Sequence, residues 1–283
     1  MSEQTLLWLV ANSASGSNDE AAQQELVERL ASAGHNPARI IDVSKDDLPS
    51  KADLDRAGVT TLAIFTGDGT IGAALPPLEG WRGQVLVLPG GTTNLLAKML
   101  HRPCEVEAIV ASFAGGGARI ERRPCVRWSG HTALCEVLAG PGAKWSDVRE
   151  GMREGDLGTV AATTIEAVKE STQGSMVHVT YPDTEHDDGY AGVRLVPSDA
   201  GLETSGYRTE GFGDLLKQGA ALLKRDFREG PHDELGAHPE IECKSEDGSA
   251  IELMIDGERV SGPGAIRFSL ATLELDLLAT GNG

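Results

Sequence analysis

The chain has 283 residues, of which 40% are apolar, and it carries 25 Lys and Arg against 43 Asp and Glu, giving a formal net charge of −18. This balance argues against nucleic acid as a partner, and against strong electrostatic docking on anionic bilayers, where each basic residue contributes about 1 kcal/mol. The length suits one large or two modest domains, and no run approaches the roughly 18 apolar residues of a membrane span.

The N-terminal residues and the cysteines indicate a cytoplasmic protein. Residues 1–4 lack the basic residues and the long apolar core of a signal peptide. The cysteines show neither metal-ligand spacing nor the density of a disulfide framework. They are Cys104, Cys125, Cys135 and Cys243. A reducing compartment is therefore expected.

The first predicted unit is a strand, a polar loop and a helix. Residues 6–10 are apolar and are followed by a loop over 12–17 that is rich in serine. A helix is expected from about residue 18 to 33, because Leu26, Val27 and Leu30 fall on one face at helical spacing.

The second unit contains the sequence Ile-Phe-Thr-Gly-Asp-Gly-Thr over residues 64–70. An apolar strand breaks there into two glycines around a carboxylate. Glycine has no Cβ, so such a loop can bring backbone N–H groups close to a bound anion, while Asp68 could orient a metal, a water or a hydroxyl. The alternative is a plain Asp-Gly turn.

The third unit repeats this arrangement. The apolar run 85–88 leads into Pro-Gly-Gly-Thr-Thr-Asn over 89–94, and a helix is predicted over 95–100. The N–H groups at the start of a helix favour anions. The alternative is that Thr93 or Asn94 serves only as an N-cap. Three polar loops that each follow a strand predict the ligand-binding edge of an open α/β sheet.

The chain changes character after the glycines at 115–117. Shorter runs that alternate apolar and polar residues then predict a half-buried antiparallel sheet. The expected strands are 118–128, 132–139, 176–181, 192–196, 241–244, 251–255 and 265–270, with helical stretches at 157–172 and 212–227. We therefore predict an α/β domain with the three polar loops over 1–117 and a β-rich domain over 118–270.

The sequence Ile-Asp-Gly-Glu at 255–258 lies in this second half. Its local pattern predicts a β-hairpin, with an Asp-Gly turn between strand 251–255 and residues 258–260.

These segments together resemble the diacylglycerol kinase catalytic family of lipid kinases, which includes sphingosine and ceramide kinases. The family's Asn-Pro-x-Ser-Gly loop is matched by residues 12–16, with Ser13 in the proline position. Its Gly-Gly-Asp-Gly-Thr loop is matched by 66–70, with Thr66 in place of a glycine, and its Pro-x-Gly-Thr-x-Asn loop by 89–94. NAD kinases share the central loop, but the third loop favours the lipid kinases.

The resemblance implies an open Rossmann-like α/β sheet, as in NAD kinase, followed by a β-rich sandwich. It also implies that residues 271–283 return to the first domain. The implied activity is ATP-dependent transfer of a phosphoryl group, with Mg²⁺, to a hydroxyl of a lipid that the protein meets transiently at the membrane surface. Asp68 and Glu258 are the implied catalytic residues, with Asp256 second to Glu258 as the base. The nucleotide would contact Asn12, Ser13, Gly67, Asp68, Gly69, Thr70, Gly91, Thr92 and Asn94.

Apart from Ser13 and Thr66, the sequence departs from the family at two places, and these departures keep alternatives open. Gly72 and Ala73 stand where the family has Asn-Glu. Residues 197–203 lack the Asp-Asp-Gly metal segment, and the Asp-Asp-Gly at 187–189 reads as an acidic turn. The metal ligands and the oligomeric state therefore stay open. The alternative functions are an NAD-kinase-like enzyme with a soluble acceptor and an inactive nucleotide- or lipid-binding module.

Overall fold

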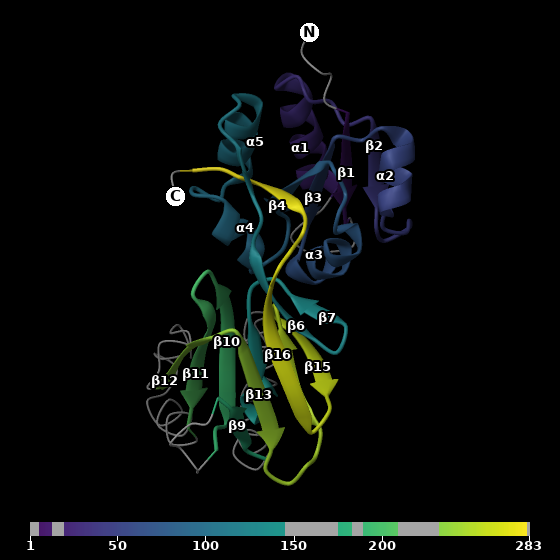
Figure 1. Cartoon of the computed structure of the whole chain (residues 1–283). Helices are drawn as coiled ribbons and strands as arrows, with labels where there is room; N and C mark the ends of the chain where they lie inside the picture. Colours follow the sequence, from purple (N-terminus) through teal and green to yellow (C-terminus); the bar gives the residue numbers. More distant parts are fainter. Residues whose placement is uncertain (1–5, 13–19, 145–174, 183–188, 209–231, 282–283) are drawn as a thin grey trace, which may run out of the picture. The chain divides into compact units, whose positions relative to one another are not determined.

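The computed structural model describes residues 6–12, 20–144, 175–182, 189–208 and 232–281 (Figure 1). The contacts divide the chain into two units. One combines Met1–Arg123 with Thr272–Gly283, and the other is Pro124–Ala271. This division falls six residues after the position expected from the sequence, because strand β5 (Arg119–Glu121) pairs with β17 (Asp276–Ala279) within the sheet of the first unit.

The first unit is built on a mostly parallel sheet. Among the described residues, six strands have the order β2-β1-β3-β4-β17-β5. All neighbours are parallel except β17 and β5. The other strands are β1 (Leu7–Ala11), β2 (Arg39–Asp42), β3 (Thr61–Thr66) and β4 (Gln84–Pro89). The chain's last strand therefore lies inside this sheet, between β4 and β5.

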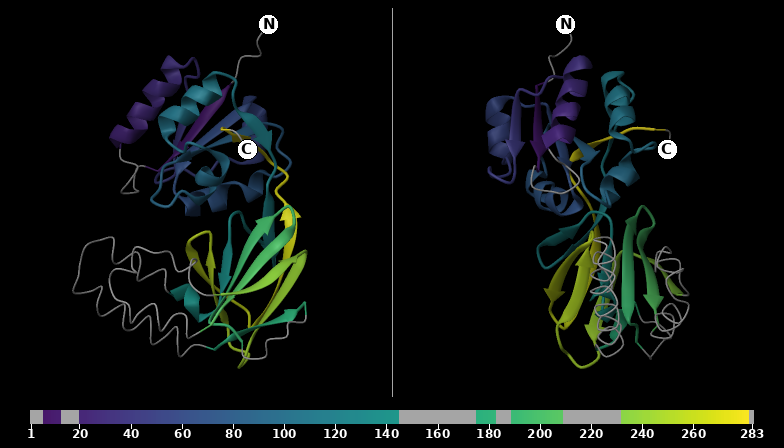
Figure 2. Two further views of the ribbon diagram at one scale, coloured as in Figure 1. Left: turned by 90° about the vertical axis from the view of Figure 1, so that its left-hand side faces the viewer. Right: turned by 180° about the vertical axis from the view of Figure 1, so that it is seen from behind.

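Helices cover this sheet, and its strands β1 and β3 are buried along their whole length. The helices are α1 (Glu20–Ser32), α2 (Lys51–Ala57), α3 (Asp68–Ala74), α4 (Leu95–Leu100) and α5 (Val106–Ala114), with the short 3₁₀ turn η1 (Pro76–Leu78). Alternate residues of a strand share one face. One such set, including Leu9, Phe65 and Leu86, packs with Leu26 of α1 and Ile109 of α5 in a common core. Figure 2 shows α1 and α5 side by side.

The second unit is a β-sandwich. In the described part of this unit, two sheets have the orders β12-β11-β10-β8-β14-β15 and β7-β6-β16-β13-β9. Their strands are β6 (Pro124–Trp128), β7 (His131–Ala133), β8 (Val137–Ala139), β9 (Val177–Tyr181), β10 (Gly192–Ser198), β11 (Gly201–Tyr207), β12 (Asp233–His238), β13 (Glu240–Ser245), β14 (Ile251–Ile255), β15 (Glu258–Gly262) and β16 (Ala265–Thr272). The 3₁₀ turn η2 (Pro141–Lys144) follows β8.

A single apolar core joins the two sheets. Val193 and Leu253 of the first sheet cluster with Ile241 and Phe268 of the second, and all four are fully buried. The side chains of the two inner faces thus exclude water between the sheets, as in other sandwiches. The expected fold class, an open α/β sheet followed by a β-rich sandwich, is confirmed.

The strand expectations were incomplete, because they did not include β2 in the first unit or two strands in the second. β11 and β12 were not predicted, because Gly-Leu-Glu-Thr-Ser-Gly-Tyr and Asp-Glu-Leu-Gly-Ala-His carry few of the β-branched residues that mark strands. They pair nevertheless, because β10 and β12 supply backbone partners on either side of β11. The helical stretches expected at 157–172 and 212–227 lie outside the described residues.

Candidate functional site

Two glycine loops of the first unit lie against each other. β3 and β4 are parallel neighbours, with Thr66 beside Pro89, so both loops begin at the same edge of the sheet (Figure 1). The contact is backbone to backbone: a Cβ at Gly91 would lie 2.5 Å from the Gly67 Cα. A Cβ at Gly90 would lie 2.6 Å from the backbone of Phe65 and Thr66. Glycine is required at both positions because of this close approach.

Asn94 closes the second loop on itself. Its backbone is left-handed, with φ 54°, and it occupies the N-cap position of α4. Its side chain makes no capping bond there. Instead, its Oδ1 accepts a hydrogen bond from the Gly91 N–H at 2.7 Å, and its Nδ2 donates to the Gly91 carbonyl at 2.8 Å. The alternative that Asn94 serves only as an N-cap is therefore wrong for its side chain, which bonds Gly91 within the loop.

Asp68 binds the start of α4 from the neighbouring loop. Its Oδ1 accepts a hydrogen bond from the Leu95 N–H at 2.8 Å, and the N–H groups of Leu96 and Asn94 also interact with its carboxylate. The side chain is half-buried. Burial raises the pKa of Asp68 above its usual value, while the backbone hydrogen bonds and the charge of Lys98 act in the opposite direction. The first loop is thus bonded to the second through this carboxylate.

The remaining predicted nucleotide contacts lie at the same edge or in the same loops. Asn12 directly follows β1, whose carboxyl end lies beside that of β3. Gly69 and Thr70 lie in the first turn of α3, whose N-cap residue, Gly67, offers no side chain to the first N–H groups. Thr92 lies between the strand β4 and α4 and is exposed. Ser13 lies outside the described residues.

Asp256 binds three backbone N–H groups in the second unit. Its Oδ2 accepts from Leu134 at 2.7 Å, and its Oδ1 accepts from Cys135 at 2.8 Å and Glu136 at 2.9 Å. Asp256 is only 7% exposed. Burial raises its pKa to about 6 in spite of these bonds. The turn between β14 and β15 is thereby fixed to the segment that precedes β8.

The hairpin around Asp256 has the predicted geometry. β14 and β15 are antiparallel, with Ile255 beside Glu258, and the two turn residues have positive φ angles of 49° at Asp256 and 97° at Gly257. Two positive φ angles define the turn type that Asp-Gly favours in tight hairpins. Glu258 follows the turn as the first residue of β15 and is exposed. Of the two acidic residues, Glu258 therefore offers the accessible carboxylate.

A partly buried ion pair lies next to Asp256. Arg194 of β10 donates to the Glu136 carboxylate at 2.9 Å, and only 6% of the Glu136 side chain is exposed. This pair was not predicted from the sequence, because the partners are 58 positions apart, with Arg194 in β10 and Glu136 just before β8. Lys98 was also missed, although its position one turn into the helix after Asn94 could have indicated a cation near the loops.

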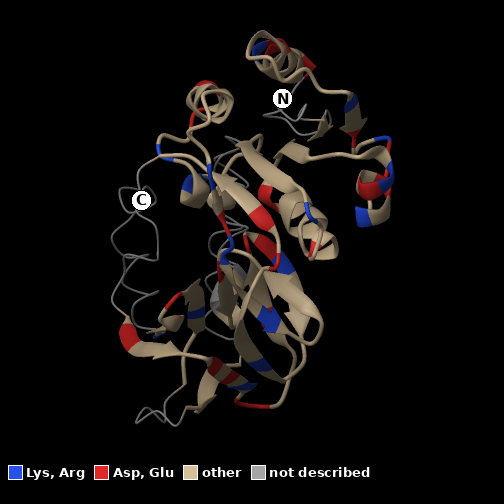
Figure 3. Ribbon diagram, turned by 45° about the horizontal axis from the view of Figure 1, so that its top comes forward, with Lys and Arg blue, Asp and Glu red and all other residues tan. Residues whose placement is uncertain are grey.

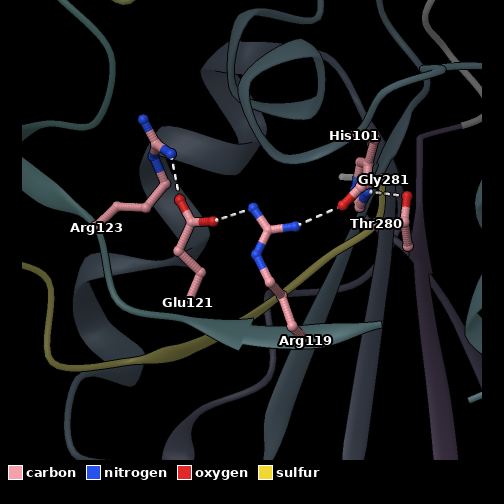
Figure 4. Close-up of polar contacts among 6 residues, drawn as sticks. All are labelled: His101, Arg119, Glu121, Arg123, Thr280 and Gly281. Atoms are coloured by element: carbon pink, nitrogen blue, oxygen red, sulfur yellow. Dashed lines mark hydrogen bonds and ion pairs between the residues drawn. The ribbon is translucent and has the colours of Figure 1, made fainter. Parts of the chain in front are cut away.

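The arginines at positions 119, 122 and 123 form ion pairs with acidic neighbours. Glu121 forms ion pairs with both Arg119 and Arg123, and Arg119 also donates to the Gly281 carbonyl at 2.8 Å (Figure 4). Arg122 forms ion pairs with Glu274 and Asp276. Along the described ribbon, acidic and basic residues are interspersed (Figure 3). These arginines therefore do not form a free basic patch.

A histidine fixes the last strand next to this arginine network. His101, 1% exposed, bonds through Nε2 to the Val87 carbonyl at 2.8 Å and through Nδ1 to the Thr280 hydroxyl at 3.0 Å (Figure 4). The carbonyl can only accept, so Nε2 carries the hydrogen and the Thr280 hydroxyl donates to Nδ1. Burial lowers the pKa of His101, which favours this neutral form.

The fold and the loops first define a class. A mostly parallel α/β sheet with glycine loops at the carboxyl ends of its strands is the usual framework of nucleotide-binding enzymes. Comparison with known families then gives a specific match: residues 6–120 match the model of the diacylglycerol kinase catalytic domain. Residues 6–120 therefore form a domain of this family. Comparison with curated proteins gives no match.

Solved structures resemble the whole chain. A crystal structure of a diacylglycerol kinase from Bacillus anthracis str. Sterne matches with a TM-score of 0.64 and 16% identity, covering 99% of this chain and 98% of that one. Two further structures from that organism, both provisionally described as a diacylglycerol kinase, match over the same shares with TM-scores of 0.67 and 0.62 and identities of 18% and 17%. At these identities the likeness concerns the fold.

Proposed function

We propose that the chain is an ATP-dependent lipid kinase, which transfers the γ-phosphoryl group to a hydroxyl of a lipid such as diacylglycerol or a sphingoid base. The observation that carries this proposal is the family match over 6–120, together with the contact between the two glycine loops that this match includes. A substrate that is a lipid requires the protein to meet a membrane surface transiently. In the described residues, no helix is both long and apolar enough to cross a bilayer.

The first unit offers suitable donors for the nucleotide phosphates. The N–H groups and the hydroxyl of residues 69–70 lie at the start of α3, where no side chain caps the helix. The Thr92 hydroxyl is exposed in the facing loop, and Lys98 provides positive charge nearby. Phosphoryl transfer depends mainly on such positioning and charge neutralisation. Asn12, at the end of β1, would contact the nucleotide from the same edge.

The hydroxyl groups at this edge of the sheet fit a Mg²⁺ ion that enters with the nucleotide. Among the described residues there is no group of three or more His, Cys, Asp or Glu side chains that could hold a metal ion. Mg²⁺ prefers oxygen ligands, keeps several waters and is commonly held through substrate phosphates. The Thr70 and Thr92 hydroxyls are oxygen donors of this kind. When bound, Mg²⁺ neutralises charge on the transferring phosphates.

Glu258 is the proposed base for the lipid hydroxyl. It is exposed, whereas both carboxylate oxygens of Asp256 accept backbone hydrogen bonds. The Glu258 carboxylate would take the hydroxyl proton as the oxygen bonds to the γ-phosphorus. The bond from that phosphorus to the bridging oxygen breaks, and ADP leaves. Asp256 would keep the turn, and with it Glu258, in place.

The experiment combines one protein preparation with several acceptors. Labelled ATP and Mg²⁺ are incubated with a panel of lipid alcohols in mixed micelles, with NAD in parallel, and one arm contains a chelator. We expect transfer to a lipid hydroxyl that is lost with the chelator. Transfer to NAD alone would select the NAD-kinase-like alternative. Nucleotide binding without transfer would select an inactive module, the reading favoured by Gly72 and Ala73.

A variant pair tests the base. Removing a general base costs roughly 10²–10⁴-fold in rate, so Glu258→Gln should lose that much turnover while still binding ATP. Glu246→Gln is the matched control, because Glu246 is also exposed and also lies beside a turn of the second unit. Equal turnover in the two variants would exclude Glu258 as the base.

A further inference from the structure

His101 joins three segments of the first unit that are far apart in the sequence. Its Nε2–H donates to the Val87 carbonyl of β4 at 2.8 Å, and its Nδ1 accepts from the Thr280 hydroxyl at 3.0 Å (Figure 4). All three residues are buried. A buried polar group is costly unless it is hydrogen-bonded, so the carbonyl, the imidazole ring and the hydroxyl depend on one another.

The bond to Val87 closes the segment that carries the second glycine loop. Val87 lies shortly before Pro89, where the loop begins, and His101 directly follows α4. The loop 89–94 and α4 therefore lie between two bonded residues, which are 14 positions apart. α4 has only six residues, and a helix of this length gains little stability from its own hydrogen bonds. The arrangement of the loop thus depends on contacts from outside the helix, and the His101 bond is one of them.

The backbone that follows β17 is held against the end of α4. The Thr280 N–H donates to the Leu100 carbonyl at 3.0 Å, and the Arg102 N–H donates to the Thr280 carbonyl at 3.1 Å. At the next residue, a Cβ on Gly281 would overlap the Arg102 carbonyl oxygen, so the two backbones approach closely. These contacts fix the position of the Thr280 hydroxyl beside the His101 ring.

We propose that Thr280 and His101 are positioning residues, which hold the loop 89–94 in the arrangement that binds the nucleotide. The Thr280 hydroxyl fixes the imidazole ring, and the ring fixes β4 to the end of α4. In this role neither residue contacts the nucleotide or takes part in the chemistry. The part of this inference that concerns ATP rests on the proposed function, whereas the part that concerns the loop does not.

Two substitutions of Thr280 separate its hydroxyl from the packing of its side chain. Thr280→Val has nearly the same shape but no hydroxyl, so the buried Nδ1 loses its donor while Nε2 stays bonded to Val87. Thr280→Ser keeps the hydroxyl and loses only a methyl group. The matched control is Thr204→Val in the second unit, because Thr204 is also buried and its hydroxyl donates to the Leu202 carbonyl at 2.9 Å.

The first readout is amide hydrogen exchange without any ligand, measured by mass spectrometry of peptides. In Thr280→Val, we expect exchange over residues 89–101 to become about two- to tenfold faster, the effect of one lost hydrogen bond on a local opening equilibrium. Thr280→Ser and Thr204→Val should match the wild type in this segment. Unchanged exchange over 89–101 in Thr280→Val would overturn the proposal, even if exchange over 276–281 increased.

The second readout is ATP, by titration of binding and by KM and kcat with a lipid acceptor. Apparent affinity falls with the fraction of molecules whose loop is in the binding arrangement, so Thr280→Val should raise the KM for ATP by about two- to tenfold. Its kcat should stay at the wild-type value, because saturating ATP restores the loop.

The control variants decide between positioning and a merely structural role. Thr280→Ser should restore the KM for ATP, and Thr204→Val should leave it unchanged although it removes a comparable buried bond. A KM for ATP in Thr280→Val equal to that in Thr204→Val would refute the positioning role. Should the wild type bind no ATP, the proposed function fails, and hydrogen exchange still decides whether Thr280 and His101 hold the loop.

Discussion

The two units each contain an aspartate, next to a glycine, that binds three successive backbone N–H groups of a distant segment. Asp68 interacts with residues 94–96 and Asp256 with residues 134–136. In both cases burial raises the pKa of the carboxyl group. The two sites differ in exposure, because Asp68 is half-buried at the start of a helix, whereas Asp256 is 7% exposed beside the Glu136–Arg194 ion pair.

This difference indicates how to read an acidic residue in a glycine-containing motif. In both loops the carboxylate accepts hydrogen bonds from backbone N–H groups. The exposed fraction of the side chain then determines whether a ligand can also reach it. Asp256 is almost fully buried, so we assign the proposed role of the base to the exposed Glu258. Asp68 is partly exposed, so experiments must distinguish contact with a ligand from its bonds to the start of α4. Variants of Asp256 and of glycines in or near the two loops can test this comparison.

The largest effect is expected for Asp256→Ala. Three buried N–H groups would lose their acceptor, at a cost of about 1–3 kcal/mol for each unsatisfied group. The second unit should therefore lose roughly 3 kcal/mol or more of unfolding free energy, measured by denaturant titration. Glu258→Ala, two positions away and exposed, should change it by less than about 0.5 kcal/mol. Similar losses in both variants would mean that the bonds of Asp256 do not stabilise the fold.

The pH dependence of stability gives a second test of Asp256. Its pKa is raised from 3.8 to about 6 by burial, so the folded chain retains a proton that the unfolded chain releases between these values. The stabilisation is therefore complete below about pH 4 and is lost as the pH rises through about 6. Asp256→Asn cannot titrate there. The unfolding free energy of the wild type minus that of Asp256→Asn should therefore fall from pH 4 to pH 7. A difference that stays constant over this range would contradict the raised pKa.

The sequence predicted the aspartates but not what they bind. Glycines and acidic residues are visible as motifs, and the positions of the strands before them follow from apolar runs. The partners are backbone N–H groups, which almost every residue has, so no side-chain pattern distinguishes residues 94–96 or 134–136. The same limit applies to β11, which contains two glycines and few β-branched residues and is held by its neighbours. The periodicity of a sequence does not show which residues that are far apart in the chain will be in contact.

A smaller effect is expected from two other glycines, Gly91 in the loop that faces Asp68 and Gly257 beside Asp256, for different reasons. Gly91→Ala would place a Cβ 2.5 Å from the Gly67 Cα, which forces the loops apart and should cost about 1–3 kcal/mol. Gly257→Ala meets no atom within 4 Å but must adopt a φ of 97°, a strained conformation that should cost about 1–2 kcal/mol. ATP binding separates them: the first variant should weaken it and the second should not. Weakened binding in Gly257→Ala alone would reverse this assignment.

The smallest effect, and the only gain, is expected at Gly72 of α3. A Cβ there meets no atom within 4 Å, and the residue lies in a helix that starts at Asp68. Alanine restricts the unfolded chain more than glycine does and favours the helix, so Gly72→Ala should stabilise the first unit by about 0.5–1 kcal/mol. Because α3 positions the carboxylate that caps α4, a firmer α3 should leave ATP affinity unchanged or slightly higher. Denaturant titration and ATP titration of this one variant measure both quantities, and a loss of affinity on stabilisation would show that α3 must move when the nucleotide binds.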